Sequence, residues 1–192
     1  MADLITFETI AEQWGHPEVV AGYFARADAK YVPFNWRLDW RREDYGKRSG
    51  SLAPRRQFVA DLAKAIEDSG VPMVSGTDAP TIPGIVPGFS LHDNLDRLVA
   101  AGLTRFEALS TATRTAGNVI NQSIHNAPSF GKVQRGYRAD LILSDANPLD
   151  DLETLRKPAG VMSHGHWYDR ADLQGLLDSV ASDYSAAAAP SH

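Results

Sequence analysis

The stretch Gly70-Val71-Pro72-Met73-Val74-Ser75-Gly76-Thr77-Asp78 decides the fold class. Residues 54–69 before it begin with a proline, which suits the first turn of a helix, and Gly70 suits the position directly after a helix. Four apolar side chains of this predicted helix share the spacing of one helical face: Phe58, Leu62, Ala65 and Ile66. The apolar run after Gly70 predicts a buried strand over residues 71–78. A helix, a glycine turn and a buried strand make up the repeating unit of a parallel α/β fold.

Two further helices are predicted after a loop rich in proline and glycine at residues 79–90. The first begins at Ser90, a residue that caps helices well, and ends before Gly102. The second begins at Thr104, with Glu107 three residues later in the spacing of a capping box. Loops that follow strands are where α/β proteins meet their substrates, so the loop at 79–90 is the predicted substrate loop.

The two ends of the chain carry different patterns. Residues 1–30 show helical spacing broken at Gly15-His16-Pro17, which predicts one or two short helices, and residues 31–53 are predicted to be a surface loop with Trp36 and Trp40 as aromatic anchors. Beyond residue 130 the pattern changes to short strands. The elements predicted there are strands at 132–134 and 139–144, a hairpin at 160–168 turned at Gly165, a helix at 170–181 and a disordered tail at 185–192.

The composition excludes several classes of protein. The chain has 192 residues, 24 acidic against 19 basic side chains, a net charge of -5 and no cysteine. Disulfides, thiol nucleophiles, cysteine-bound zinc and iron–sulfur clusters are therefore excluded, and any metal must be held by His, Asp, Glu or backbone oxygen. The acidic balance argues against binding to nucleic acid or to a membrane surface. The first residues lack the pattern of a signal peptide, so the predicted location is the cytoplasm.

Three ordered segments are similar to a known family. They are Gly76–Ala79 at the end of the predicted strand, Pro87–His92 running on through Leu95–Thr104 and Glu107–Thr113, and Gly131–Gly136 with Ala139–Ser144 and Asn147–Leu149. In this order and at these spacings they resemble the C-terminal third of a metal-dependent amidohydrolase. The branch that they resemble most is the imidazolonepropionase-like and prolidase-like (Xaa-Pro dipeptidase-type) enzymes. The resemblance spans residues 55–175.

The resemblance implies an α/β fold: the last part of a (β/α)8 TIM-like barrel plus the C-terminal half of a small β-sandwich. On this interpretation residues 1–125 are the barrel part with strand eight at 71–78, residues 126–170 are the sandwich part, and residues 171–192 are a terminal helix and a disordered tail. A whole barrel takes at least about 200 residues, so the predicted fold is incomplete. A truncated reading frame, a remnant of an enzyme and one half of a split protein are all open interpretations.

The resemblance also implies the chemistry. In such enzymes the Asp after strand eight binds a divalent metal and moves a proton from the attacking water to the leaving nitrogen, so Asp78 is the predicted catalytic residue and metal ligand. Zinc is the expected metal, and the remaining ligands have no matching position in this chain. A His in the place of His92 can face the substrate, although a polar residue near a helix start is an equally good interpretation. Where the family often has Glu two residues further on, this chain has Asn94.

A second pair of histidines, in His164-Gly165-His166, has the spacing of two metal ligands on one strand. A glycine turn between them would instead spread the two rings apart, and the position in the chain matches a late hairpin of the family. The hairpin is the favoured interpretation.

Two hypotheses for the function follow. The first is a piece of a metal-dependent hydrolase of C–N bonds (amide, cyclic amide or Xaa-Pro-type peptide), whose partner is a small-molecule or dipeptide-like substrate. The alternative is a non-catalytic remnant or split-protein half that acts as an assembly module, because a partial barrel exposes sheet edges and apolar faces. A missing N-terminal half or a second copy of the chain would then be the partner.

Overall fold

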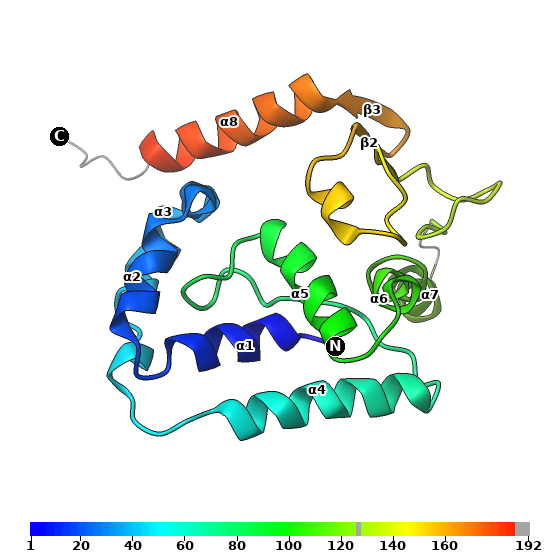
Figure 1. The fold of residues 1–192 in the computed structure, drawn as a ribbon. Helices are drawn as coiled ribbons and strands as arrows, with labels where there is room; N and C mark the ends of the chain where they lie inside the picture. The colour runs from blue at the N-terminus through cyan, green and yellow to red at the C-terminus, as the bar shows by residue number, and fades with distance from the viewer. Residues whose placement is uncertain (126–127, 187–192) are drawn as a thin grey trace.

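The computed structural model describes residues 1–125 and 128–186 as an α/β structure with many helices and one small sheet (Figure 1). The helices are α1 (Leu4–Gln13), α2 (Pro17–Ala25), α3 (Phe34–Trp40), α4 (Ala53–Asp68), α5 (Phe89–Ala100), α6 (Arg105–Ala112), α7 (Arg114–Ser123) and α8 (Arg170–Ala186). Three 3-10 helices join them: η1 (Ala27–Tyr31), η2 (Tyr45–Lys47) and η3 (Leu152–Arg156). The strands are β1 (Leu141–Leu143), β2 (Gly160–Ser163) and β3 (His166–Asp169).

The predicted strand at 71–78 is corrected by the structure. The segment is extended but makes only one bridge, in which Ser75 lies parallel to Ala2. The Ala2 amide donates to the Val74 carbonyl oxygen at 2.7 Å, and the Gly76 amide donates to the Ala2 carbonyl oxygen at 3.4 Å. A ladder needs a partner strand along its length, and α1 begins as early as Leu4. Among the described residues, this bridge is the one parallel pairing, so the barrel stays a prediction.

Helix α4 confirms the helix predicted before this segment, with Pro54 in its first turn and Gly70 at a φ of 73° just beyond its end. Of the predicted apolar face, Ile66 packs against the core. Phe58 is 63% exposed and Leu62 is 44% exposed, so the prediction is wrong for these two residues. The core also receives the neighbouring edge of the helix, through Val59, Ala60 and Ala63. Helical spacing marks an apolar stripe but does not say which edge of it meets α1, the helix beside α4 in Figure 1.

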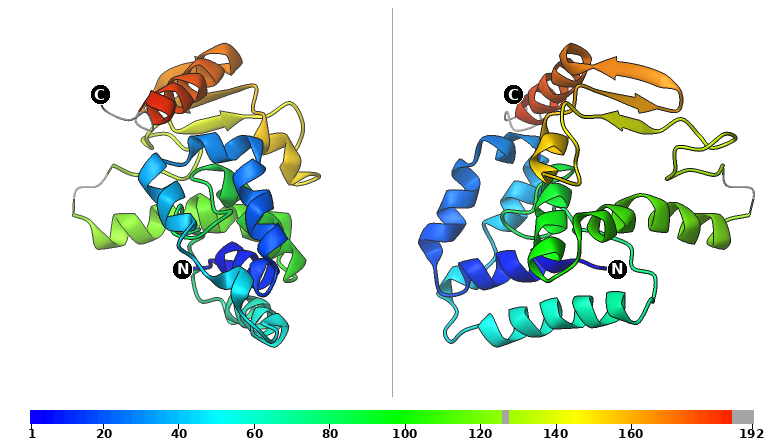
Figure 2. Two further views of the ribbon diagram at one scale, coloured as in Figure 1. Left: turned by 90° about the vertical axis from the view of Figure 1, so that its left-hand side faces the viewer. Right: turned by 45° about the vertical axis from the view of Figure 1, so that its right-hand side comes forward.

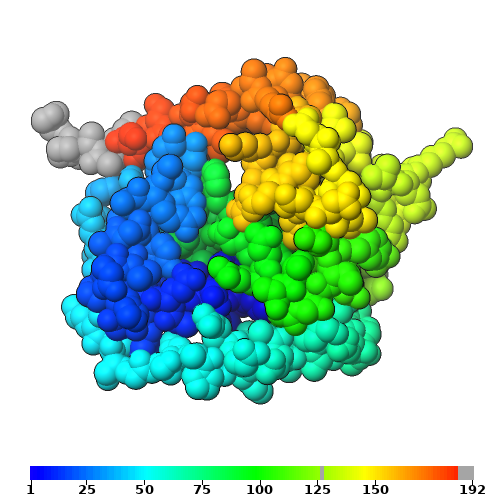
Figure 3. All heavy atoms as spheres, in the orientation of Figure 1, coloured from blue at the N-terminus to red at the C-terminus, as the bar shows by residue number. Residues whose placement is uncertain are grey.

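The main core surrounds α5. Leu95 and Leu98 of this helix are buried together with Leu4 of α1 and Ala63 of α4. Leu152 of η3 joins the same cluster, so this part of the C-terminal region packs on the helices. The space-filling view shows this contact where η3 and its flanking residues, in yellow, meet α5 and α6, in green (Figure 3). The predicted boundary at residues 125 and 126 stays a prediction.

The prediction of a loop over residues 31–53 is wrong, because this segment contains α3 and η2. Trp40 at the end of α3 is fully buried, and its Nε1 donates to the Pro80 carbonyl oxygen at 2.7 Å. Val32 and Val86 complete this second cluster. The tryptophan is the anchor that the sequence indicates, but it anchors a helix against the predicted substrate loop.

The sheet is antiparallel in the order β1-β2-β3 and lies beside α8, which contacts β2 and β3 (Figure 2). The predicted hairpin is confirmed: Ser163 pairs with His166, and the turn places His164 and Gly165 at φ values of 51° and 81°. Residues 132–134 form no strand, which corrects that prediction, and the strand predicted at 139–144 is shorter, as β1. Helix α8 confirms the predicted terminal helix, and most of the predicted disordered tail, residues 187–192, lies outside the described residues.

Helices able to cross a membrane are not found in the part of the chain that the structure describes.

Candidate active site

The parallel bridge places two carboxylates, Asp3 and Asp78, after its two neighbouring segments. Ala2 is followed by Asp3, and Ser75 is followed three residues later by Asp78. The two segments run in the same direction, so both aspartates follow the carboxyl ends of paired segments, where α/β folds place their ligands. We call these four residues, with Asn94, the carboxylate junction.

Asp3 caps the first turn of α1. Its Oδ1 accepts a hydrogen bond from the Thr6 amide at 3.1 Å. The Thr6 Oγ1 lies 2.8 Å from Asp3 Oδ2 and 3.0 Å from the Thr77 carbonyl oxygen, so one hydroxyl joins the two segments. Burial raises the pKa of Asp3 above its usual range, the hydrogen bonds from Thr6 lower it, and the charge of Asp78 raises it. The Asp78 charge therefore acts on Asp3 across the junction.

Asp78, the predicted catalytic residue, is exposed and has a φ of 49°. Its carbonyl oxygen accepts hydrogen bonds from the Thr81 hydroxyl at 2.6 Å and from the Thr81 amide at 3.1 Å. Its Oδ2 lies 3.4 Å from the same hydroxyl, so most of the acceptor capacity of the carboxylate faces outward. Aspartate tolerates the left-handed backbone region better than most residues do.

The described residues do not complete a metal site by themselves. No group of three or more His, Asp or Glu side chains in residues 1–125 and 128–186 is placed to hold an ion. A catalytic zinc has three protein ligands as a rule. The exposed Asp78 carboxylate has the capacity of one such ligand, whereas the two oxygens of Asp3 lie within hydrogen-bonding distance of the Thr6 amide and hydroxyl.

Asn94 is a junction residue that the sequence did not reveal. It is fully buried in α5. Its Oδ1 accepts from the amides of Leu4 at 2.8 Å and Ile5 at 3.0 Å. Its Nδ2 donates to the Ala2 carbonyl oxygen and to Ser75 Oγ, both at 2.8 Å. The signal available in the sequence was a polar amide, Asn94, on the apolar face of the helix, directly before the core residue Leu95.

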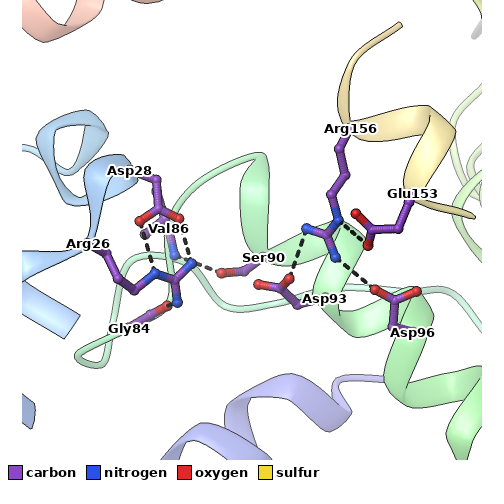
Figure 4. A network of polar contacts seen from close by, with 9 residues as sticks. All are labelled: Arg26, Asp28, Gly84, Val86, Ser90, Asp93, Asp96, Glu153 and Arg156. Carbon is purple, nitrogen blue, oxygen red and sulfur yellow. Dashed lines mark hydrogen bonds and ion pairs between the residues drawn. The ribbon is translucent and has the colours of Figure 1, made fainter. Parts of the chain in front are cut away.

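His92, the predicted substrate-binding residue, lies in the first turn of α5 and is half-buried. Burial lowers its pKa, and the charge of Arg156 lowers it further against the opposing effect of nearby carboxylates. Arg156 itself contacts three carboxylates, as Figure 4 shows: Asp93 at 2.9 Å, Asp96 at 2.7 Å and Glu153 at 2.8 Å. The contacts found among the described side chains do not join His92 to Asp78.

The predicted substrate loop is held rather than open. Ile82, Ile85 and Val86 are buried. The Val86 amide donates to Ser90 Oγ at 2.8 Å, and the Arg26 guanidinium, paired with Asp28, lies 3.4 Å from the Gly84 carbonyl oxygen (Figure 4). The prediction of Ser90 as the cap of α5 is wrong, because Gly88 takes the capping position and Ser90 lies inside the first turn.

The second pair of histidines is part of a surface hairpin. His164 lies in the turn, with its amide donating to Asp140 Oδ1 at 2.8 Å. His166 begins β3 and packs edge-on against Tyr168, with ring centroids 4.6 Å apart. The hairpin interpretation is confirmed.

One curated protein and two solved structures show what this chain is similar to. No protein-family profile matches it. The ochratoxinase of Aspergillus niger is 33% identical over 93 residues, which are 48% of this chain and 18% of that protein. The structure of bottromycin amidohydrolase superposes with a TM-score of 0.68 at 24% identity, over 94% of this chain and 39% of that one. A structure described as a prolidase of Bifidobacterium longum superposes with a TM-score of 0.51 at 33% identity, over 64% of this chain and 30% of that one.

The fold is similar to that of bottromycin amidohydrolase, and about half of the sequence is similar to part of an ochratoxinase. The chain spans less than a fifth of the curated relatives that it matches.

Proposed function

We propose that this chain carries part of the active site of a metal-dependent hydrolase of C–N bonds. The substrate class is an amide, a cyclic amide or an Xaa-Pro-type peptide. The observation that carries the proposal is the position of Asp78: an exposed carboxylate directly after a parallel-bridged segment, in a fold similar to that of an amidohydrolase. The similarity to an ochratoxinase and to a prolidase supports the same class of reaction.

Asp78 is the metal ligand and the proton carrier in this proposal. A divalent metal, for which we choose zinc, would lower the pKa of the attacking water toward neutrality. The Asp78 carboxylate would accept a proton from that water and would deliver it to the leaving nitrogen. The turn that Thr81 closes holds the Asp78 backbone in place while the carboxylate stays accessible. The other metal ligands would come from outside the described residues, because the junction offers one free carboxylate.

His92 binds the substrate in this proposal. Burial and the charge of Arg156 lower its pKa, which favours the neutral ring. A neutral imidazole has one donor and one acceptor nitrogen and can hydrogen-bond a substrate amide. The cytoplasmic location stays a prediction.

Metal content and hydrolysis test the proposal together. The purified chain is dialysed against trace zinc, analysed for metal, and incubated with an N-acyl amino acid amide and an Xaa-Pro dipeptide. Because the junction supplies one ligand, we expect zinc and hydrolysis where a second copy of the chain or an added N-terminal half supplies the others. Under those conditions the surface control Asp183→Asn keeps both, and Asp78→Asn loses both. If the wild-type chain holds no metal and cleaves neither substrate, the proposal that this chain is active by itself is wrong.

An assembly module is the second candidate, and exposed apolar side chains favour it. The groove between α6, α7 and β1 has a volume of about 490 Å³. We call its exposed apolar residues, with the neighbouring Leu143, the apolar edge: Phe106, Val133, Ile142 and Leu143. The partner would be a second copy of this chain or a missing N-terminal half. Sedimentation analysis at rising concentration tests this candidate, and a monomer throughout excludes self-assembly.

A further inference from the structure

The acceptor half of Asn94 fixes the start of α1. The first amides of a helix have no partner within the helix. Asn94 Oδ1 accepts from two of them, those of Leu4 and Ile5, while Asp3 accepts from the amide of Thr6. Because Asp3 immediately precedes these amides, the position of the Asp3 carboxylate depends on where Asn94 holds the helix start.

The donor half of Asn94 spans the parallel bridge. One hydrogen of Nδ2 reaches the Ala2 carbonyl oxygen, and the other reaches Ser75 Oγ on the segment that leads to Asp78. A side-chain amide has two donor and two acceptor positions, and all four are used here. Two of these contacts hold the start of α1, one holds the residue before Asp3, and one holds the Asp78 segment.

Few other contacts align the two segments. The bridge is one residue long, and outside it the Thr6 hydroxyl reaches the Thr77 carbonyl oxygen. A carboxylate at position 94 would lack the two donors, and an apolar side chain of similar size would leave buried donors and acceptors without partners.

We propose that Asn94 is a positioning residue that sets the separation of the Asp3 and Asp78 carboxylates. The proposal rests on the proposed function, because the separation matters only where Asp78 does chemistry. Asn94 does not touch the substrate in this assignment. It acts by hydrogen-bonding the two backbone segments that lead to Asp3 and Asp78.

Amide exchange and carboxyl chemical shifts measured by NMR test this role without an activity assay. The Gly76 amide donates to the Ala2 carbonyl oxygen, which Asn94 Nδ2 also reaches, and makes no hydrogen bond to Asn94 itself, so its exchange reports the alignment of the two segments. We expect Asn94→Leu to lose about tenfold or more of the Gly76 protection, relative to the Ala108 amide inside α6. We also expect the change in the Asp3 carboxyl carbon shift caused by Asp78→Asn to fall by about half or more in the Asn94→Leu background.

Leu98→Ala is the matched control, because Leu98 is equally buried in α5 and makes no hydrogen bond to either segment through its side chain. This variant loses stability but should keep the Gly76-to-Ala108 ratio and the Asp3 response to Asp78→Asn. Ser75→Ala, which removes one of the four contacts, replaces Asn94→Leu if that variant does not fold, and a smaller loss is expected.

An unchanged ratio and an unchanged Asp3 response in the Asn94 or Ser75 variants overturn the proposal. Equal losses in Leu98→Ala overturn it as well, because the role would then be packing alone. Hydrolysis is not measured in these experiments. An inactive wild-type chain with the expected NMR result would contradict the proposed function and leave the alignment role standing.

Discussion

The carboxylate junction and the apolar edge differ in how far their side chains find partners within the chain. At the junction a fully buried amide uses all four hydrogen-bonding positions, and Thr6 links the two segments a second time. At the apolar edge Val133 is 89% exposed and Ile142 is 57% exposed. Strand β1, which carries Ile142, has a neighbour on one side within the described sheet.

The comparison distinguishes a region whose contacts lie within this chain from a surface that is available to a partner. Buried polar groups are costly unless they are paired, so the junction is held by contacts that the chain supplies internally. Exposed apolar residues that line a groove are typical of surfaces that bind something. The two regions therefore correspond to the two candidate functions, and variants in each should fail in different assays.

The largest effect is expected at the junction. Asn94→Leu leaves the amides of Leu4 and Ile5 unpaired and removes one of two donors to the Ala2 carbonyl and the contact to the half-buried Ser75 hydroxyl. Each unpaired buried group costs about 1–3 kcal/mol, and partial solvation reduces the sum, so we expect a loss of about 4 kcal/mol of unfolding free energy. Urea unfolding followed by circular dichroism measures it. The exposed control Asn118→Leu should change stability by less than about 0.5 kcal/mol. Equal losses of unfolding free energy in Asn94→Leu and Asn118→Leu would contradict a special role of Asn94.

A smaller effect is expected where η3 meets α5. Arg156→Met removes the cation that contacts Asp93, Asp96 and Glu153 and leaves three carboxylates close together. Because the Arg156 side chain is only 28% exposed, we expect a loss of about 1–2 kcal/mol. Arg42→Met, which removes a single exposed contact to Asp39, should cost about 0.3 kcal/mol or less. The difference between the two urea midpoints is the measurement.

The same cation should set the ionisation of His92. Burial and Arg156 hold the pKa of His92 below its usual value, while Asp93, Asp96 and Glu153 raise it. The unfolded chain then binds a proton more readily than the folded one, so His92 contributes a loss of stability as pH falls through the ordinary histidine value of 6.5. In Arg156→Met the His92 pKa should rise, and that loss should shrink.

Histidine ring shifts measured by NMR between pH 8 and pH 4.5 check this, with His16, an exposed histidine paired with Glu18, as the internal reference. A His92 titration that is identical in both proteins rules out the influence of Arg156.

The sequence predicted elements whose signals are local. Helix α4 follows from its proline and terminal glycine, α6 from the capping box of Thr104 and Glu107, and the β2–β3 hairpin from Gly165. These signals operate within a few residues, and the chain around them does not need to be known. The position of Asp78 after an extended segment was predictable for the same reason.

Features that depend on distant contacts escaped prediction. Helix α3 forms because Trp40 is buried against Val86 and the Pro80 carbonyl, 40 or more positions along the chain. Asn94 meets residues about 90 positions away, and Asp3 became part of the site only through the bridge to Ser75. Phe58 and Leu62 obeyed helical spacing but point away from the core. Periodicity identifies an amphipathic helix, whereas its partner decides the buried edge.

The smallest effect on stability, and the sharpest contrast with the junction, is expected at the apolar edge. Ile142→Ser replaces a side chain that is 57% exposed, so little burial is lost and stability should change by about 0.5 kcal/mol or less. Association should respond instead. If the edge binds a second copy, the substitution removes apolar area from the contact and shifts sedimentation toward the monomer, whereas Asn94→Leu shifts unfolding first. A wild-type chain that is already monomeric, or an Ile142→Ser chain that associates as the wild type does, would leave the exposed residues of β1 outside any self-interface. The junction would then be the one region of the two with a function to test.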